Sequence, residues 1–169
     1  MEFVRPSIEW EREHREYVEE WGPARMVPSS FDLAGFESYE MYLEALTKRE
    51  NGHGKWLPCT NYFLVNENHR ILGMVDISHE LNDFLFRFGG HIGYSVRPPE
   101  RRKGYATLIL KLALAKCKDI GINECLVTCD EDNIGSAKVI LNNGGIEDQS
   151  ETDIDGIVKR RFWIKITNS

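Results

Sequence analysis

The order of apolar and polar positions divides the chain into a helical beginning and a strand-rich remainder. The first fifty residues predict a short strand around Phe3 to Arg5, a helix from Ser7 to about Trp21, and a second helix from Gly35 to Glu50. Ser7 is well placed to cap the first helix, because its hydroxyl can accept one of the unpaired N–H groups there. The sequence GPARMVPSSFDLAG between the helices is rich in turn-forming residues and indicates a loop.

The middle of the chain has the pattern of strands. Two apolar stretches flank a polar turn at Asn66 to His69, which predicts an antiparallel β-hairpin. After a short stretch, LNDFLFRF, to which we assign no element, the sequence GGHIGYSV predicts another strand, and Pro98 and Pro99 end it. Period-two alternation places its side chains on two faces, with one set made of Ile92, Tyr94 and Val96 and the other of Gly93 and Ser95.

The last part of the chain alternates helices and strands. A helix from Gly104 to Ile120 is apolar around most of its circumference, so we expect it to be buried against a sheet. ECLVTCD reads as a central buried strand, a helix follows from Ile134 to Asn142, and GIVKRRFWIKI is the final strand. The strand, helix, strand unit from Ile92 to Asp130 predicts a parallel pair with a crossover helix. The expected fold is α/β, with a mixed sheet flanked by helices in one domain, residues 1–169.

Composition and charge exclude several classes of protein. The net charge of -6 argues against nucleic acid as a partner, which would need a broad basic face. The N-terminal stretch is too charged for a signal peptide, and no apolar run reaches the ~18 residues of a membrane span, so we expect a cytoplasmic protein without membrane contact. The four cysteines form no CxxC or CxxH pair, so they predict neither a metal site nor a disulfide framework but small buried side chains.

Against this acidic background, the stretch VRPPERRKGYATLIL is basic. Its positive residues are Arg97, Arg101, Arg102 and Lys103, and its one acidic residue is Glu100. The positive residues come just before or at the start of a predicted helix. The first N–H groups of a helix have no intrahelical partner and carry the positive end of its dipole, so they bind phosphate well. The stretch therefore predicts a site for a small anion at the start of this helix.

The same residues resemble a known motif. Arg101 to Ala106, with the sequence RRKGYA, matches R/Q-x-x-G-x-G/A of the GNAT superfamily of N-acetyltransferases. A second stretch, DNIGSAKVILNNGG, is similar to the family's N-x-x-[SA] helix and carries Asn133, Ser136 and Gly144 at its fixed positions. The order of the expected elements is also similar to the whole family fold. It has a central, mostly antiparallel twisted sheet in which one parallel pair of strands splays apart.

The resemblance implies acetyl-CoA as the cofactor and a set of residues that would hold it. The diphosphate would lie on the start of the long helix, and the pantetheine arm would pair with the strand edge opened by the splay. Asn133 would bind the pantetheine arm, act as a helix N-cap, or serve both roles. The implied cofactor residues are Tyr94, Ser95, Val96, Arg101, Arg102, Lys103, Gly104, Tyr105, Ala106, Thr107, Asn133 and Ser136.

Catalytic roles are less determined by the sequence. A backbone N–H near Val96 could hold the thioester carbonyl oxygen. Many family members carry a tyrosine proton donor at the position of Ile140, which leaves Tyr94, Ser136 or water for that role. For the base we name Glu80, although each candidate could instead be a solvated or capping side chain. The other candidates are His79, Asp76, Asp130 and Glu131.

The function that follows is acetyl transfer from acetyl-CoA to a primary amine of a small molecule or peptide in a ternary complex. The sequence does not identify the acceptor, and a homodimer is common for folds like this. His91 could be a structural histidine or face the acceptor. The aromatic residues of the first two helices could line the acceptor pocket or pack the core: Phe31, Phe36, Tyr39 and Tyr42. Two alternatives remain open, an acyl-CoA sensor without efficient catalysis and a module that binds nucleotide phosphates.

Overall fold

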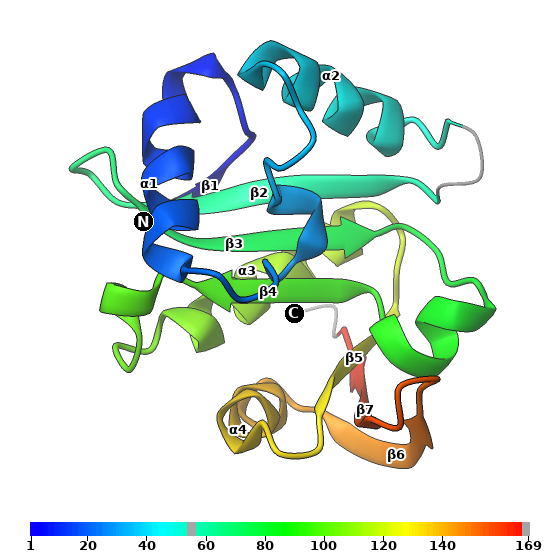
Figure 1. The fold of residues 1–169 in the computed structure, drawn as a ribbon. Helices are drawn as coiled ribbons and strands as arrows, with labels where there is room; N and C mark the ends of the chain where they lie inside the picture. Colours follow the sequence, from blue (N-terminus) through cyan, green and yellow to red (C-terminus); the bar gives the residue numbers. More distant parts are fainter. Residues whose placement is uncertain (54–56, 167–169) are drawn as a thin grey trace.

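A computed structural model describes residues 1–53 and 57–166. Two antiparallel sheets and four α-helices make up the fold of this described part (Figure 1). The strands are β1 (Glu2–Val4), β2 (Cys59–Val65), β3 (Ile71–Ser78), β4 (Ile92–Val96), β5 (Glu124–Asp130), β6 (Ile146–Thr152) and β7 (Val158–Lys165). The α-helices are α1 (Glu11–Trp21), α2 (Tyr39–Glu50), α3 (Tyr105–Asp119) and α4 (Ile134–Asn142). Shorter helical turns are η1 (Ile8–Trp10), η2 (Ser29–Phe31), η3 (Leu85–Gly89) and η4 (Pro98–Glu100).

The first sheet has the strand order β1-β2-β3-β4 and is covered on both faces (Figure 1). Helices α1 and α2 lie on one face, where Met74 of β3 and Phe63 of β2 join a cluster with Tyr17 and Phe31. Helix α3 lies on the other face, where it shares a core with the side chains of alternate strand positions. The alternation predicted for β4 is confirmed: Ile92 belongs to that core, whereas Ser95 contacts Tyr17 on α1.

The second sheet has the order β5-β7-β6, and one of its strands was missed by the sequence pattern. β6 has the sequence IEDQSET, in which six of seven residues are exposed and no apolar alternation occurs. It is the edge strand of its sheet, and it is held by pairing with β7, which includes Ile146 opposite Trp163. The hydropathy pattern cannot find a strand that buries neither face.

The predicted parallel ladder is absent, which corrects the expected mixed sheet. Every ladder in the described part of the chain is antiparallel, and β4 is not paired with β5. The two strands touch just before β4, where the His91 N–H donates to the Leu126 carbonyl and His91 Nδ1 accepts from the Leu126 N–H, at 2.7 and 2.9 Å. Gly90 permits this approach, because a Cβ there would lie 2.5 Å from the Leu126 oxygen. Beyond this contact the strands diverge and leave a gap in the sheet.

The remaining differences are at element boundaries. Ser7 precedes the short turn η1 rather than α1, and its side chain forms no capping hydrogen bond there. Helix α2 begins at Tyr39, later than predicted, because Ser38 caps it by accepting from Met41 N at 3.2 Å. LNDFLFRF contributes η3, a single wide helical turn.

Two further predictions from the sequence concern membrane-spanning segments and the cysteines. None of the helices that the structure describes has the length and apolar character needed to cross a membrane. The four cysteines are free and buried, as their spacing predicts.

Candidate functional site

A cleft of about 650 Å³ opens beside the end of β4, on the side away from β3. Its walls come from the end of β4, the start of α3, the start of α4 and two residues at or after the end of α1. None of its lining residues is an aspartate, glutamate or histidine. They are Trp21, Val27, Tyr94, Ser95, Val96, Arg101, Arg102, Gly104, Tyr105, Ala106, Thr107, Asn133, Gly135, Ser136 and Val139. The predicted cofactor residues are therefore together on this cleft, with the exception of Lys103.

The edge of β4 that faces the cleft carries backbone groups without a ladder partner. Arg97 N donates to the Leu72 carbonyl of β3 at 2.8 Å, and Ser95 pairs with Met74 of the same strand. N–H groups alternate between the two edges of a strand. Those of Tyr94 and Val96 therefore point away from β3, toward the opening. An extended ligand with amide groups fits such an edge.

The basic turn, residues 97–104, presents the start of α3 to the cleft. Arg102 has φ 63° and Gly104 has φ 85°, so two residues of this turn adopt left-handed backbone. Such a conformation is costly for a non-glycine residue and is found mainly where function requires it. No side chain caps α3, and its first turn contains no acidic residue. Its unpaired N–H groups can therefore receive an anion from the cleft.

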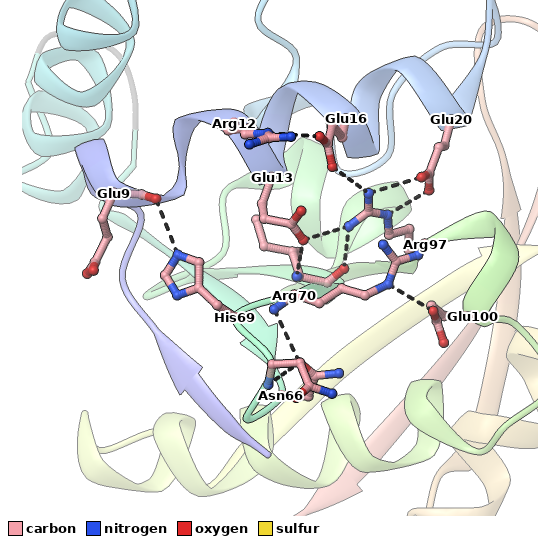
Figure 2. Close-up of polar contacts among 12 residues, drawn as sticks. Glu9, Arg12, Glu13, Glu16, Glu20, Asn66, His69, Arg70, Arg97 and Glu100 are labelled. Carbon is pink, nitrogen blue, oxygen red and sulfur yellow. Dashed lines mark hydrogen bonds and ion pairs between the residues drawn. The ribbon is translucent and has the colours of Figure 1, made fainter.

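The four positive charges of the basic turn have different partners. Arg97 is fully buried and forms ion pairs with carboxylates of α1, so its charge does not reach the cleft (Figure 2). Lys103 forms an ion pair with Glu100 at 2.9 Å. Arg101 lies over the Trp21 ring at 5.2 Å, and neither Arg101 nor Arg102 forms an ion pair within the described residues. These two guanidinium groups are the cationic side chains available to an anion in the cleft.

The start of α4 forms the opposite wall. Asn133 is the N-cap of this helix, where its Oδ1 accepts from Ser136 N at 3.1 Å. The Ser136 hydroxyl is hydrogen-bonded to the Tyr94 hydroxyl at 2.8 Å, which joins α4 to β4 across the gap. Burial raises the pKa of Tyr94 to about 12, although the hydrogen bond from Ser136 opposes this effect. The Tyr94 hydroxyl is therefore protonated at neutral pH and can donate a proton.

Ile140 does not lie on the cleft. Its side chain is completely buried in the core shared with α3, and Gly145 packs so closely that a Cβ there would be 2.7 Å from Ile140 Cγ2. Ser136 and Val139 are the α4 side chains that reach the opening. The residue at position 140 therefore serves packing here, and any proton donor comes from elsewhere.

The candidate bases lie outside the cleft. Glu80 is exposed in the bend after β3, at the end of the first sheet where β4 begins rather than where it ends. His79 is hydrogen-bonded to Thr60 at 2.6 Å, Asp130 is paired with Lys159, and Glu131 is exposed. The roles predicted for these residues stay predictions.

Asp76 is the candidate base nearest to the cleft in register, because it pairs with Gly93, the neighbour of Tyr94. Its Oδ2 accepts from Ser30 Oγ at 2.7 Å, and Ser30 Oγ in turn accepts from Asn61 Nδ2 at 2.8 Å. Burial raises the pKa of Asp76, which favours its protonated form relative to an exposed carboxyl. It does not line the opening itself.

The other residues considered from the sequence have structural contacts. His91 joins β4 to β5 as described above, and burial lowers its pKa. Phe31, Tyr39 and Tyr42 are at most 1% exposed and surround His14 in the core between α1 and α2. Phe36 is 38% exposed and packs against Tyr42.

Sequence reasoning missed several residues of the site. Trp21, Val27, Gly135 and Val139 line the cleft but carry no motif. Sequence reasoning also grouped Arg97 with the cations of the predicted anion site, whereas Arg97 is buried. A signal for the burial of Arg97 was present, because α1 repeats glutamate at spacings that place Glu13, Glu16 and Glu20 on one helix face.

The family model for the acetyltransferase (GNAT) domain matches residues 6–146. The chain belongs to the GNAT acetyltransferase family. It is thus an acyltransferase of a family that takes acetyl groups from acetyl-CoA, as the two sequence motifs predict. No curated protein matches the chain in sequence.

Solved structures show the same GNAT fold over nearly the whole chain. A point mutant of the spermidine N-acetyltransferase SpeG from Vibrio cholerae has a TM-score of 0.67 at 14% identity, with 98% of this chain and 95% of that chain covered. The acetyltransferase from Salmonella typhimurium that modifies the N-terminal serine of ribosomal protein L7/L12 has a TM-score of 0.68 at 13% identity, covering 98% and 94%. RimJ from Mycobacterium smegmatis, solved with CoA-disulfide, has a TM-score of 0.68 at 16% identity, covering 96% and 80%.

Proposed function

We propose that this GNAT acetyltransferase transfers the acetyl group of acetyl-CoA directly to a primary amine of a small molecule or peptide, with both substrates bound together. The cleft beside the end of β4 carries the proposal. It combines an uncapped helix start, two guanidinium groups without ion pairs among the described residues and a free strand edge, and none of its lining residues is acidic. These features suit the diphosphate and the amide-containing arm of CoA.

The donor side of the cleft, formed by the end of β4 and the starts of α3 and α4, would bind the cofactor. The N–H groups of residues 104–107, with Arg101 and Arg102, would hold the diphosphate, and Lys103 would add only long-range charge because Glu100 pairs with it. The edge N–H and C=O groups of Tyr94 and Val96 would pair with the pantetheine amides, beside Ser95. Asn133 would act through the helix that it caps, because its side chain accepts the Ser136 N–H and so fixes the first turn of α4 beside the ligand.

Tyr94 and Ser136 would supply the proton that the reaction needs. The bound thioester provides an activated acetyl group. The amine nitrogen bonds to the carbonyl carbon as the C–S bond breaks, so nitrogen loses a proton and the thiolate gains one. The Val96 N–H would hold the carbonyl oxygen, and the Tyr94 hydroxyl, oriented by its hydrogen bond with Ser136, would protonate the thiolate. Water would take the proton that the amine loses and would return one to Tyr94. Glu80 remains a predicted base only, since it lies outside the cleft.

The acceptor side, formed by α1, α2 and the loop between them, leaves the amine unidentified. Among the structural neighbours, one acts on spermidine and another on the N-terminal serine of a ribosomal protein. Both acceptors present primary amines, but identities of 13 to 16% do not choose between them. We therefore propose the reaction and not the acceptor.

The test is release of CoA thiol from acetyl-CoA in the presence of a panel of polyamines, amino acids and peptides with free N-termini. We expect at least one amine to raise release about tenfold or more above hydrolysis. Tyr94→Phe should lower kcat about a hundredfold with little change in CoA affinity, whereas Tyr62→Phe on β2, away from the cleft, should not. Stabilisation by CoA without turnover of any amine would favour the acyl-CoA sensor, and stabilisation by ATP but not CoA would favour a nucleotide module.

A further inference from the structure

We propose that Arg97 is a positioning residue that fixes helix α1 against the end of β4 and so sets the acceptor side of the cleft. The proposal rests on the proposed function, because it assigns α1 to the acceptor. It concerns a residue that lies outside the cleft and touches neither substrate site directly. Its effect would pass through α1 to Trp21, the α1 residue on the cleft wall.

Arg97 makes an unusually complete set of contacts (Figure 2). Its Nη1 donates to Glu13 Oε1 at 2.9 Å and to the Ile71 carbonyl at 3.1 Å. Nε and Nη2 donate to the two carboxylate oxygens of Glu20 at 2.6 and 3.0 Å, and Glu16 lies 3.6 Å from Nη2. The three glutamates occupy one face of α1, so a single guanidinium spans two turns of the helix.

The ion pairs stabilise the charged form of the buried Arg97 guanidinium. Burial alone would lower the pKa of Arg97, but the hydrogen bonds that it donates to Glu20 and Glu13 outweigh burial and raise it. Burial likewise acts to raise the pKa of Glu13, and the Ile71 N–H together with Arg97 lowers it overall. Buried ion pairs contribute little net stability compared with apolar packing of the same volume, and in some proteins they specify geometry instead. We assign that role to Arg97 because its contacts span two turns of α1.

The geometry that Arg97 fixes is the relation between the two sides of the cleft. Arg97 follows Val96 directly, and the Tyr17 hydroxyl of α1 is hydrogen-bonded to Ser95 Oγ at 2.8 Å. Helix α1 is thus joined to Ser95 of β4 and to Arg97 just after the strand, next to the edge proposed to hold pantetheine. Glu20, which makes the two-oxygen contact, immediately precedes Trp21. A shift of α1 would move the wall that faces the acetyl group, and misplacement by ~1 Å can cost ~100-fold in rate.

The experiment uses a variant that removes the ion pairs without leaving unpaired charges: Arg97→Met combined with Glu13→Gln and Glu20→Gln. With the best amine of the panel, kcat/KM should fall between about tenfold and about a hundredfold. CoA affinity should change less than about threefold, because the start of α3, Arg101 and Arg102 are untouched. The resonance of Trp21 in protein labelled with fluorotryptophan, assigned with Trp21→Phe, should shift. Arg97→Lys keeps the charge but cannot reach both carboxylates, so its kcat/KM should fall as well.

The matched control is Arg161→Met with Asp148→Asn. Arg161 is also buried, on β7, where it donates to the Phe86 carbonyl and pairs with Asp148, and neither residue lines the cleft. We expect a comparable loss of melting temperature with unchanged kcat/KM and an unchanged Trp21 resonance. The proposal is overturned if the folded triple variant keeps its wild-type kcat/KM, if CoA affinity falls as much as kcat/KM, or if the control loses transfer equally. Failure of the proposed function would appear separately, as no amine turnover in the wild type, and an unmoved Trp21 resonance would then still reject the positioning role.

Discussion

The two sides that we propose for the donor and the acceptor are built from different parts of the amino acids. The donor side uses backbone: uncapped N–H groups of α3, the free edge of β4 and small residues such as Gly104 and Ala106. The acceptor side uses side chains, with aromatic rings packed around a buried histidine and one buried arginine holding α1. With these assignments, we expect CoA binding to depend on a few local positions and the acceptor geometry to depend on the packing of the whole N-terminal layer.

The largest effect is expected from a side chain placed in the donor side. Gly104→Glu should lower CoA affinity by about a thousandfold or more, because a carboxylate would occupy the anion site and repel the diphosphate. A Cβ at Gly104 meets nothing within 4 Å, so the only cost to folding is the strain of its φ of 85°. Titration calorimetry with CoA measures the affinity.

Gly121→Glu is the matched control for this change. Gly121 stands at the other end of α3 with φ 86°, also with nothing within 4 Å of a Cβ. Both variants should lose similar stability, and only Gly104→Glu should lose CoA. Equal CoA affinity in the two variants would refute the donor-site assignment.

A smaller effect is expected on the stability of the proposed acceptor side when the pH is lowered. His14 donates from Nε2 to the Phe31 carbonyl and accepts at Nδ1 from the Tyr39 hydroxyl, and burial lowers its pKa from 6.5 to about 4. The unfolded chain therefore binds this proton more readily than the folded protein does. The free energy of unfolding should fall by about 3 kcal/mol as pH drops from 6.5 to 4, and level off below.

Urea denaturation at several pH values measures this slope. His14→Gln keeps one donor and one acceptor but does not titrate, so its slope between about pH 6.5 and about pH 4 should be much flatter. Equal slopes in the two proteins would assign the acid effect to other groups.

The smallest effect separates capping from cofactor binding at Asn133. Asn133→Ala removes the N-cap of α4 and should cost about 1 kcal/mol of stability. Ser38→Ala removes the corresponding cap of α2 and should cost a similar amount. Because α4 borders the cleft and the start of α2 does not, we expect only Asn133→Ala to weaken CoA binding, by about threefold to tenfold. Equal CoA affinity in both variants would leave Asn133 with the structural role alone.

The contrast between backbone recognition and side-chain packing also explains which features could be predicted from the sequence. Residues 101–106 and Asn133 could be placed because backbone recognition requires particular small or capping residues at fixed spacing, and such requirements are local. The two faces of β4 could be predicted because side chains alternate along a strand. Arg97 was misplaced because its partners lie 77 to 84 positions away. The glutamate spacing of α1 indicates a face for ion pairs but does not say which cation meets it. The contact that joins the start of β4 to β5 depends on His91 and Gly90 meeting Leu126 in the folded protein. β6 could not be predicted because its sequence has no apolar alternation.

The gap between β4 and β5 interrupts hydrogen bonding but not the core. Residues from both sheets, among them Val75, Ile92, Val127 and Phe162, belong to one continuous apolar cluster beneath it, together with α3 and α4. The two sheets are therefore coupled in folding although they share no ladder, and they should unfold as one cooperative unit. An elongated molecule can therefore enter the cleft without detaching a strand, because the two strands are already separated in the folded protein.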